Sequence, residues 1–203
     1  MSEFRVVVIG ASASGLDPVR LITQALPRKC GAAVIVVMQV GHNSDLPEIL
    51  NWHGKLPALF GREGEAIEAG RLYVAPPDRH MVVMAPGVIH LDAGPRVHST
   101  RPAIDPLFAS VAEIYGRRVV GVVLSGRGED GAAGLRMIHD HGGLALIQDP
   151  AEAAEPEMPA AARAQDDPEV LRIEQLSRRI FQFCSVMNGR LIGDEPPDGR
   201  QAA

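Results

Sequence analysis

The stretch Phe4-Arg-Val-Val-Val-Ile-Gly-Ala-Ser-Ala-Ser-Gly-Leu16 begins as a β-branched apolar run and then turns through small residues. From Leu16 to Leu26 apolar residues recur at helical spacing until a proline follows, so the segment predicts a strand, a tight turn and a helix. The predicted strand Ala33 to Val40 is continuously apolar up to Met38, as strands are when helices cover both faces of a parallel sheet. These two strands indicate the fold class.

The rest of the chain returns to the same alternation after one interruption. Between residues 57 and 91 the pattern changes to short alternating segments separated by turn residues, which predicts hairpins. Helix and strand patterns then alternate again, at Pro106–Tyr115, Val119–Leu124, Ala132–His141, Leu144–Ile147, Pro159–Ala164, Val170–Ile173 and Glu174–Met187. The sequence therefore predicts an α/β fold, a doubly wound, mostly parallel sheet with helices on both faces and an antiparallel hairpin region around residues 57-91.

The length and composition indicate one domain. A chain of 203 residues with 46% hydrophobic residues is long enough to bury one sizeable core. We expect this domain to span residues 1-192. Residues 193-203 are polar and rich in Pro and Gly, so we expect a disordered C-terminal tail.

Several classes of partner are disfavoured by the same composition. The net charge of -5 comes from 25 acids mixed with 20 bases, with no basic block to neutralise nucleic-acid phosphates. The longest apolar run, Ala32 to Val40, is too short for membrane insertion, and no secretory signal opens the chain, so we expect a cytoplasmic protein. Cys30 and Cys184 lack metal-site or disulfide-framework spacing and are expected to be buried hydrophobes; neither metal nor cofactor is predicted.

A serine stands at the turn that follows the first strand. The segment Gly10-Ala-Ser12-Ala-Ser14-Gly15 is close to the G-x-S-x-G nucleophile elbow, in which small neighbours let the chain turn and leave the hydroxyl exposed. Open α/β sheets bind ligands at the carboxyl edge of their strands. Ser12 is therefore a candidate nucleophile, and the alternative is a glycine loop that cradles a phosphate at the helix start.

A second glycine-rich turn carries an acid. Leu124-Ser-Gly-Arg-Gly-Glu-Asp130-Gly-Ala-Ala-Gly134 follows a buried strand and opens a helix, so it delivers Asp130 to the same sheet edge as Ser12. One edge would then hold a hydroxyl and a carboxylate. The alternative is that Asp130 simply caps the helix.

Taken with the segments between them, these turns resemble the catalytic domain of the bacterial chemotaxis protein-glutamate methylesterases (CheB type). The resemblance covers residues 5 to 182 in the right order and rests on several motifs together. The matching segments are Val8 to Gly15, Tyr73 to His80, Arg101 to Phe108, Gly121 to Gly134, Gln148-Asp-Pro and Met158-Pro159.

The resemblance implies a function and roles for individual residues. In that family a Ser-His-Asp triad hydrolyses methyl esters of glutamate side chains on chemoreceptor helices and often deamidates glutamines there. By position, Ser12 would be the nucleophile and Asp130 the acid that orients the imidazole, while backbone N–H groups around Ala13 and Arg127 would face the oxyanion. Family members usually carry a phosphorylatable receiver domain ahead of this one. Because this chain begins at the first strand, we expect that another chain would have to supply a receiver domain. A methyltransferase is a further expected partner.

The histidine of that triad is missing from its place. Relatives end the second strand with Gln-His, whereas this chain reads Val36-Val-Met-Gln39-Val40, so Gln39 falls where the imidazole should be. An amide does not titrate and cannot take a proton from Ser12. Loss of the base of a hydrolytic triad lowers kcat by on the order of 10⁴ to 10⁶, so we expect weak or absent esterase activity.

Other positions near the expected site leave alternatives open. His42 could replace the base only if residues 40 to 43 fold back over Ser12, because three extended residues span about 10 Å; otherwise it is a loop histidine. His80 either lines the pocket or is a satisfied structural histidine. Arg101 either meets acidic receptor side chains or is a surface group. Relatives have threonine and glycine where this chain has Ala13 and Ser14, which removes one hydroxyl and crowds the turn.

Three functions are compatible with this sequence. The first is an active or weakly active hydrolase of receptor glutamate methyl esters. The second is a catalytically inactive binding or regulatory module that keeps the fold in a chemosensory-type signalling system, and Gln39 favours it. The third is nucleotide binding at the Gly10 to Gly15 turn, which is disfavoured because the acid expected about 20 residues after a dinucleotide loop is absent.

Overall fold

The computed structural model describes residues 4–39, 45–187 and 190–191. Its centre is a seven-stranded sheet in the order β3-β4-β2-β1-β7-β8-β9, and every neighbouring pair is parallel. The strands are β1 (Arg5–Ser12), β2 (Ala32–Gln39), β3 (Ala58–Phe60), β4 (Leu72–Val74), β7 (Val119–Val123), β8 (Leu144–Gln148) and β9 (Glu169–Leu171). The predicted α/β class is confirmed, while the expected tail, residues 193–203, lies outside the described residues.

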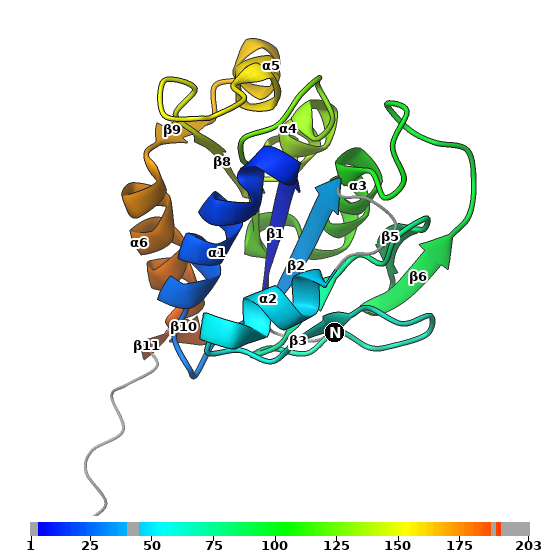
Figure 1. Cartoon of the computed structure of the whole chain (residues 1–203). Coiled ribbons are helices and arrows are strands. Elements are labelled where there is room, and N and C mark those ends of the chain that lie inside the picture. The colour runs from blue at the N-terminus through cyan, green and yellow to red at the C-terminus, as the bar shows by residue number, and fades with distance from the viewer. Residues whose placement is uncertain (1–3, 40–44, 188–189, 192–203) are drawn as a thin grey trace, which may run out of the picture.

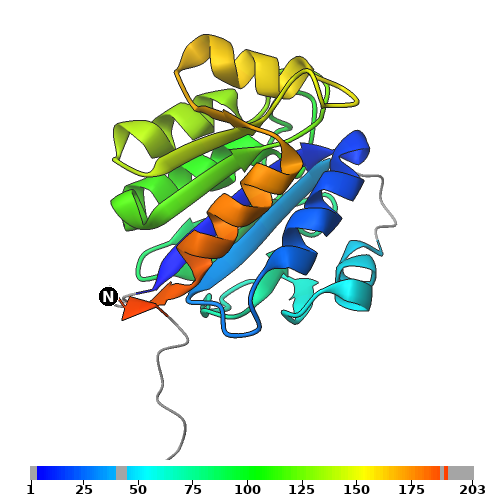
Figure 2. The same ribbon diagram turned by 90° about the vertical axis from the view of Figure 1, so that its left-hand side faces the viewer.

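Helices cover both faces of the sheet (Figures 1 and 2). One layer contains α1 (Leu16–Ala25), α2 (Leu46–His53) and α6 (Ile173–Cys184), and the other contains α3 (Ile104–Tyr115), α4 (Ala132–Asp140) and α5 (Glu157–Gln165). Each layer closes its own apolar core against the sheet. The valines of β1 and β2 are buried on both faces, which explains why these strands show no polar alternation. Cys30 and Cys184 are buried in the first of these cores, as the sequence predicted.

The antiparallel region is narrower than the sequence predicted. β5 (His80–Met84) and β6 (Val88–Asp92) form an antiparallel pair that packs on the α3 side. The segments at β3 and β4, which we expected in hairpins, instead join the main sheet in parallel beside β2. Strands of three residues are too short for periodicity to separate a parallel edge strand from a hairpin arm.

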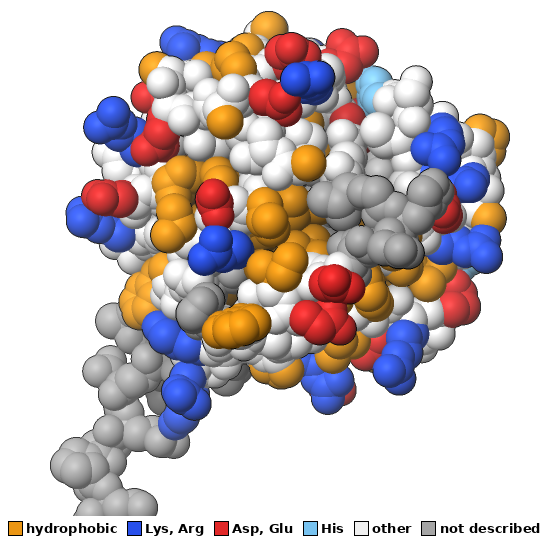
Figure 3. All heavy atoms as spheres, viewed as in Figure 1, with side chains coloured by type: hydrophobic (Ala, Val, Ile, Leu, Met, Phe, Trp, Pro, Cys, Tyr) orange, Lys and Arg blue, Asp and Glu red, His pale blue; other side chains and the backbone are white. Residues whose placement is uncertain are grey.

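The outer surface of the first helix layer carries exposed apolar side chains. Leu21, Ile49, Trp52 and Phe181 are between 36% and 82% exposed, and Figure 3 shows hydrophobic side chains gathered over α1 and α2. Among the described residues, no helix combines the length and the apolar character needed to cross a membrane.

Candidate active site

Two neighbouring strands bring the first pair of site residues together. β1 ends at Ser12 and β2 ends at Gln39, and these two residues are direct partners in the parallel register. The chain then turns through a short 3₁₀ helix, Ala13–Gly15, into α1. A Cβ on Gly15 would lie 2.6 Å from that of Ala11, so this turn requires glycine there. Ser12 is thus the last residue of the strand, at the carboxyl edge of the sheet.

Asp130 reaches the same edge from the turn between β7 and α4. Its side chain is nearly inaccessible, with the residue 2% exposed. Oδ2 accepts hydrogen bonds from Gln39 Nε2 at 2.6 Å and from the backbone N–H of Ile104 at 2.8 Å, and Oδ1 accepts one from the N–H of Asp105 at 3.0 Å. Asp130 therefore does not cap its own helix, α4, which has no side-chain cap; it holds the first turn of α3.

The environment of Asp130 opposes its charge. Burial raises the pKa of the Asp130 carboxyl above the ordinary aspartate value, and the N–H groups of Ile104 and Asp105 lower it by a smaller amount. The neighbouring Asp105 carboxylate raises this pKa further. An N–H donor such as the Gln39 amide favours the ionised form, because it satisfies an oxygen that water does not reach.

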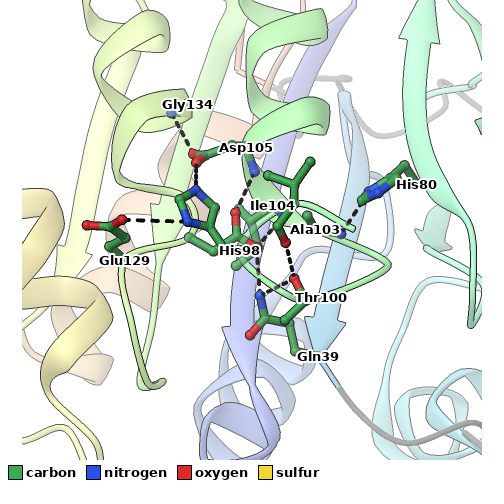
Figure 4. A network of polar contacts seen from close by, with 11 residues as sticks. Gln39, His80, His98, Thr100, Ala103, Ile104, Asp105, Glu129 and Gly134 are labelled. Atoms are coloured by element: carbon green, nitrogen blue, oxygen red, sulfur yellow. Dashed lines mark hydrogen bonds and ion pairs between the residues drawn. The ribbon is translucent and has the colours of Figure 1, made fainter. Parts of the chain in front are cut away.

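Gln39 is fixed as a hydrogen-bond donor. Its Nε2 donates to Asp130 Oδ2 at 2.6 Å and also to Thr100 Oγ1 at 3.1 Å, and Figure 4 shows Gln39 and Thr100 pointing toward each other. The Thr100 hydroxyl in turn donates to the carbonyl of Val97 at 3.0 Å. Sequence reasoning missed Thr100, which sits in a loop without periodicity. In this arrangement Gln39 holds Asp130 but supplies no titratable group.

The Ser12 hydroxyl contacts side chains other than Gln39 and Asp130. Ser12 Oγ lies 3.3 Å from Ser14 Oγ, and Ser14 Oγ lies 2.9 Å from Ser125 Oγ. The Ser14 hydroxyl thus has a hydrogen-bond partner on the β7–α4 turn. A Cβ on Gly126 would lie 3.1 Å from Ser12 Oγ and 2.1 Å from Met158 Sδ, so glycine is required where the β7–α4 turn passes the serine.

Glu155 is an acid of this site that sequence reasoning missed. Ser12 Oγ donates to Glu155 Oε2 at 3.4 Å, and Arg127 Nε donates to Glu155 Oε1 at 2.6 Å. Hydrogen bonding from Ser14, followed by Arg127 and Ser12, holds the pKa of Glu155 below the ordinary glutamate value. Glu155 lies in the Ala/Glu/Pro loop between β8 and α5, where one acid among several carried no signal.

The remaining sequence candidates are placed as follows. His80 is 3% exposed; its Nε2 lies 2.9 Å from the carbonyl of Pro95, and its Nδ1 accepts the N–H of Ala103 at 3.3 Å. Both ring nitrogens are thus used by the backbone, which supports the structural alternative. Arg101 Nη1 donates to the carbonyls of Ala93 and Gly94, each at 2.7 Å. Ala13 is exposed beside Ser12, and His42 lies outside the described residues.

A histidine that we did not single out, His98, lies between Asp105 and Glu129 (Figure 4). His98 Nε2 is 3.0 Å from Asp105 Oδ2, and His98 Nδ1 is 3.7 Å from Glu129 Oε1. One ligand atom each from His98, Asp105 and Asp130 lie within 4.8 Å of one another, a spacing that suits a cation. The carboxylates of Asp105 and Asp130 already accept backbone N–H groups, including that of Gly134 at 2.7 Å, so we describe His98 as hydrogen-bonded to Asp105.

A parallel α/β sheet whose carboxyl edge carries an alcohol and a buried acid is typical of hydrolytic enzymes. A family model described as CheB methylesterase matches residues 7–180. The chain belongs to this family.

Individual relatives agree with the family match. The putative protein-glutamate methylesterase/protein-glutamine glutaminase of Leptospira interrogans is 35% identical over 184 residues, which cover 89% of this chain and 95% of that protein. The protein-glutamate methylesterase/protein-glutamine glutaminase of Yersinia pestis is 35% identical over 190 residues, covering 91% of this chain and 54% of the relative. The second such protein of Anaeromyxobacter dehalogenans is 42% identical over 155 residues, covering 75% of this chain and 45% of the relative.

These relatives differ in length, and a solved structure matches the whole fold. The chain covers nearly all of the Leptospira protein but only about half of the other two. The crystal structure of the Thermotoga maritima CheB methylesterase catalytic domain superposes with a TM-score of 0.83 at 27% identity, covering 89% of this chain and 99% of that one.

Proposed function

We propose that this chain is a slow serine hydrolase of glutamate methyl esters, or of glutamine side-chain amides, on chemoreceptor helices in the cytoplasm. The observation that carries the proposal is the pairing of Ser12 with Gln39 at one sheet edge, with the Gln39 amide 2.6 Å from the buried Asp130 carboxylate. Ser12 would attack the side-chain carbonyl. Asp130 would hold Gln39, and the N–H groups of Ala13 and Arg127 would face the developing oxyanion.

The expected rate is low because Gln39 cannot take the serine proton. Oriented donors and substrate binding alone leave roughly 10³ to 10⁴ of acceleration over water in hydrolases that lack a triad member. A receiver domain or a methyltransferase on another chain would be a partner under this proposal.

The test is methanol release from a methylated receptor, or from a peptide that carries a glutamate γ-methyl ester. Ser12→Ala should abolish the release, whereas Ser177→Ala, on the distant helix α6, should not change it. Ser177 Oγ donates to a carbonyl of its own helix at 2.9 Å, which makes it a matched control. Equal rates for the unmodified protein and Ser12→Ala would remove the hydrolase function.

A second candidate is a catalytically inactive module that binds receptor helices, a methyltransferase or a signalling kinase. It is favoured by one observation: the Gln39 amide is directed at Asp130 and Thr100 as a donor. Ser12-dependent turnover in the unmodified protein would exclude it. Nucleotide binding at the Gly10 to Gly15 turn is disfavoured, because the Glu155 carboxylate at Ser12 would repel a phosphate.

A further inference from the structure

The hydroxyl of Ser12 meets a carboxylate that the sequence order hides. Glu155 stands 143 positions along the chain from Ser12, yet its Oε2 accepts the Ser12 hydroxyl hydrogen at 3.4 Å. This hydrogen bond is long, but catalytic hydrogen bonds in enzymes without substrate are often long and tighten when substrate binds. The contact places a proton acceptor on a serine whose strand partner, Gln39, cannot act as one.

The loop that carries Glu155 is held against the turn that follows β7. The backbone N–H of Glu155 donates to Ser125 Oγ at 2.9 Å, and its carbonyl accepts the N–H of Gly126 at 2.9 Å. The N–H of Met158 donates back to the carbonyl of Gly126 at 2.9 Å. These bonds fix the backbone of Glu155 relative to Ser12, since Ser12 N donates to the carbonyl of Ser125 at 3.2 Å.

The side chain of Glu155 is divided between two partners. Arg127 Nε holds Oε1 at 2.6 Å, which leaves Oε2 directed at Ser12. The carboxylate is 27% exposed, while the Arg127 side chain is 78% exposed. Solvent screens the charges of so exposed a pair, so the pair adds little to stability. We therefore assign to Arg127 the role of orienting the Glu155 carboxylate.

We propose that Glu155 is the general base for Ser12 in this chain, a role that the resemblance assigns to a histidine in the family. This inference rests on the proposed hydrolase function, which it deepens by naming a further catalytic residue. Gln39 and Asp130 then shape the wall of the site, and the proton leaves Ser12 toward the side of the site where Glu155 and Arg127 lie.

The chemical steps balance with the ester substrate and one water molecule as the reactants. The Ser12 Oγ–H proton moves to Glu155 Oε2 while Oγ bonds to the ester carbonyl carbon; protonated Glu155 then passes this proton to the methoxy oxygen as the C–O bond breaks, and methanol leaves. A water molecule next gives a proton to Glu155 and attacks the acyl carbon. Ser12 Oγ departs and recovers the proton from Glu155, which leaves the free glutamate side chain.

A carboxylate base and a histidine base differ in their pH dependence. Arg127, Ser12 and Ser14 face Glu155 and keep its pKa below the ordinary range, so it stays ionised, and able to accept a proton, well below pH 6. An imidazole with its ordinary pKa of about 6.5 loses its basic form in that range. Asp130 also titrates near the site with a raised pKa, so the comparison must use proteins that all keep Asp130.

The experiment is a double-mutant cycle between Glu155→Gln and Gln39→His. Two rates are measured: methanol release from the γ-methyl ester peptide and labelling of Ser12 by a fluorophosphonate probe. In the natural background, Glu155→Gln should slow both by about 10²- to 10⁴-fold, while Glu152→Gln in the same loop, whose carboxylate accepts the N–H of Ile173, should change neither. In the Gln39→His background, where an imidazole can take the proton, Glu155→Gln should slow both less than tenfold.

Each outcome bears on a separate statement. Unchanged labelling in Glu155→Gln would overturn the base assignment, and so would an equal loss in both backgrounds, since that indicates a structural role. Glu155-dependent labelling without ester turnover would support the base and reject the proposed substrate. Between pH 7 and 5 the unmodified protein should keep its labelling rate better than Gln39→His/Glu155→Gln does, and parallel profiles would also overturn the assignment.

Discussion

Replacement of Gln39 by histidine should convert this chain into a faster hydrolase. Gln39 is the strand partner of Ser12, and its Nε2 lies 2.6 Å from Asp130 Oδ2, so an imidazole there can donate one ring N–H to the acid and leave the other nitrogen for the serine. A positioned general base contributes roughly 10² to 10⁴ in rate, which corresponds to about 2.7 to 5.4 kcal/mol at 1.36 kcal/mol per tenfold.

We expect Gln39→His to lower the folding stability by less than the roughly 2.7 to 5.4 kcal/mol that it removes from the activation barrier. Thr100 Oγ1 loses the donor that Gln39 Nε2 supplies at 3.1 Å, which is worth about 0.5 to 1.5 kcal/mol. The Thr100 hydroxyl keeps its own bond to Val97 at 3.0 Å, so we expect the variant to fold. The imidazole should rank as the stronger base because its ordinary pKa, about 6.5, lies closer to neutral pH than that of a carboxylate.

The assay is methanol release from the γ-methyl ester peptide between pH 5 and 8. Gln39→His should be at least 100-fold faster than the unmodified protein at pH 8, within the range expected for a positioned base, and its rate should fall as the imidazole protonates. The same substitution combined with Ser12→Ala is the control and should be inactive. A folded Gln39→His protein with an unchanged rate would refute the view that the amide at the strand position of Gln39 limits the rate of this site.

Two further predictions concern the groups around Ser12. Burial raises the pKa of Asp130, so the folded state binds its proton more tightly than the unfolded chain does. The ionised carboxylate therefore destabilises the folded state at neutral pH. This destabilisation is relieved as the pH falls through the raised pKa toward the ordinary aspartate range. The free energy of unfolding in urea should therefore rise more in the unmodified protein than in Asp130→Asn as the pH falls from 7 toward the ordinary aspartate range, and parallel curves would contradict this. Gly126→Ala should lower stability by about 1 to 3 kcal/mol through overpacking, since its Cβ would lie 2.1 Å from Met158 Sδ. Gly128→Ala, whose Cβ meets nothing within 4 Å at φ +80°, should lose only about 1 to 2 kcal/mol from backbone strain.

The fold was predictable because its strongest signals lie in the most buried strands. The runs at β1, β2 and β7 are apolar without alternation because both faces are covered, and each is followed by a glycine-containing turn or a helix. The edge strands β3 and β4 were assigned to hairpins because three residues cannot reveal which neighbour they pair with. Pairing at an edge depends on tertiary contacts, and those are not local in sequence.

The positions of Ser12 and Asp130 at the carboxyl edge of the sheet were predictable, because each follows a buried parallel strand. Gln39 was singled out by the family resemblance, and the structure brings it into contact with Asp130 through a hydrogen bond. The direction of the Asp130 contacts was not predictable. A carboxylate beside a helix start is expected to cap that helix, but this one accepts the N–H groups of Ile104 and Asp105 on α3.

Glu155 shows why a side chain that contacts Ser12 is hard to find from sequence alone. Gln39 is visible in the sequence because it ends a well-defined strand, but a partner for the Ser12 hydroxyl can come from any loop that passes it. Glu155 reaches Ser12 only because its backbone bonds to Ser125 and Gly126 fold the β8–α5 loop over the serine. That geometry depends on three segments far apart in the chain, so only a structure could distinguish Glu155 from the other acids of its loop.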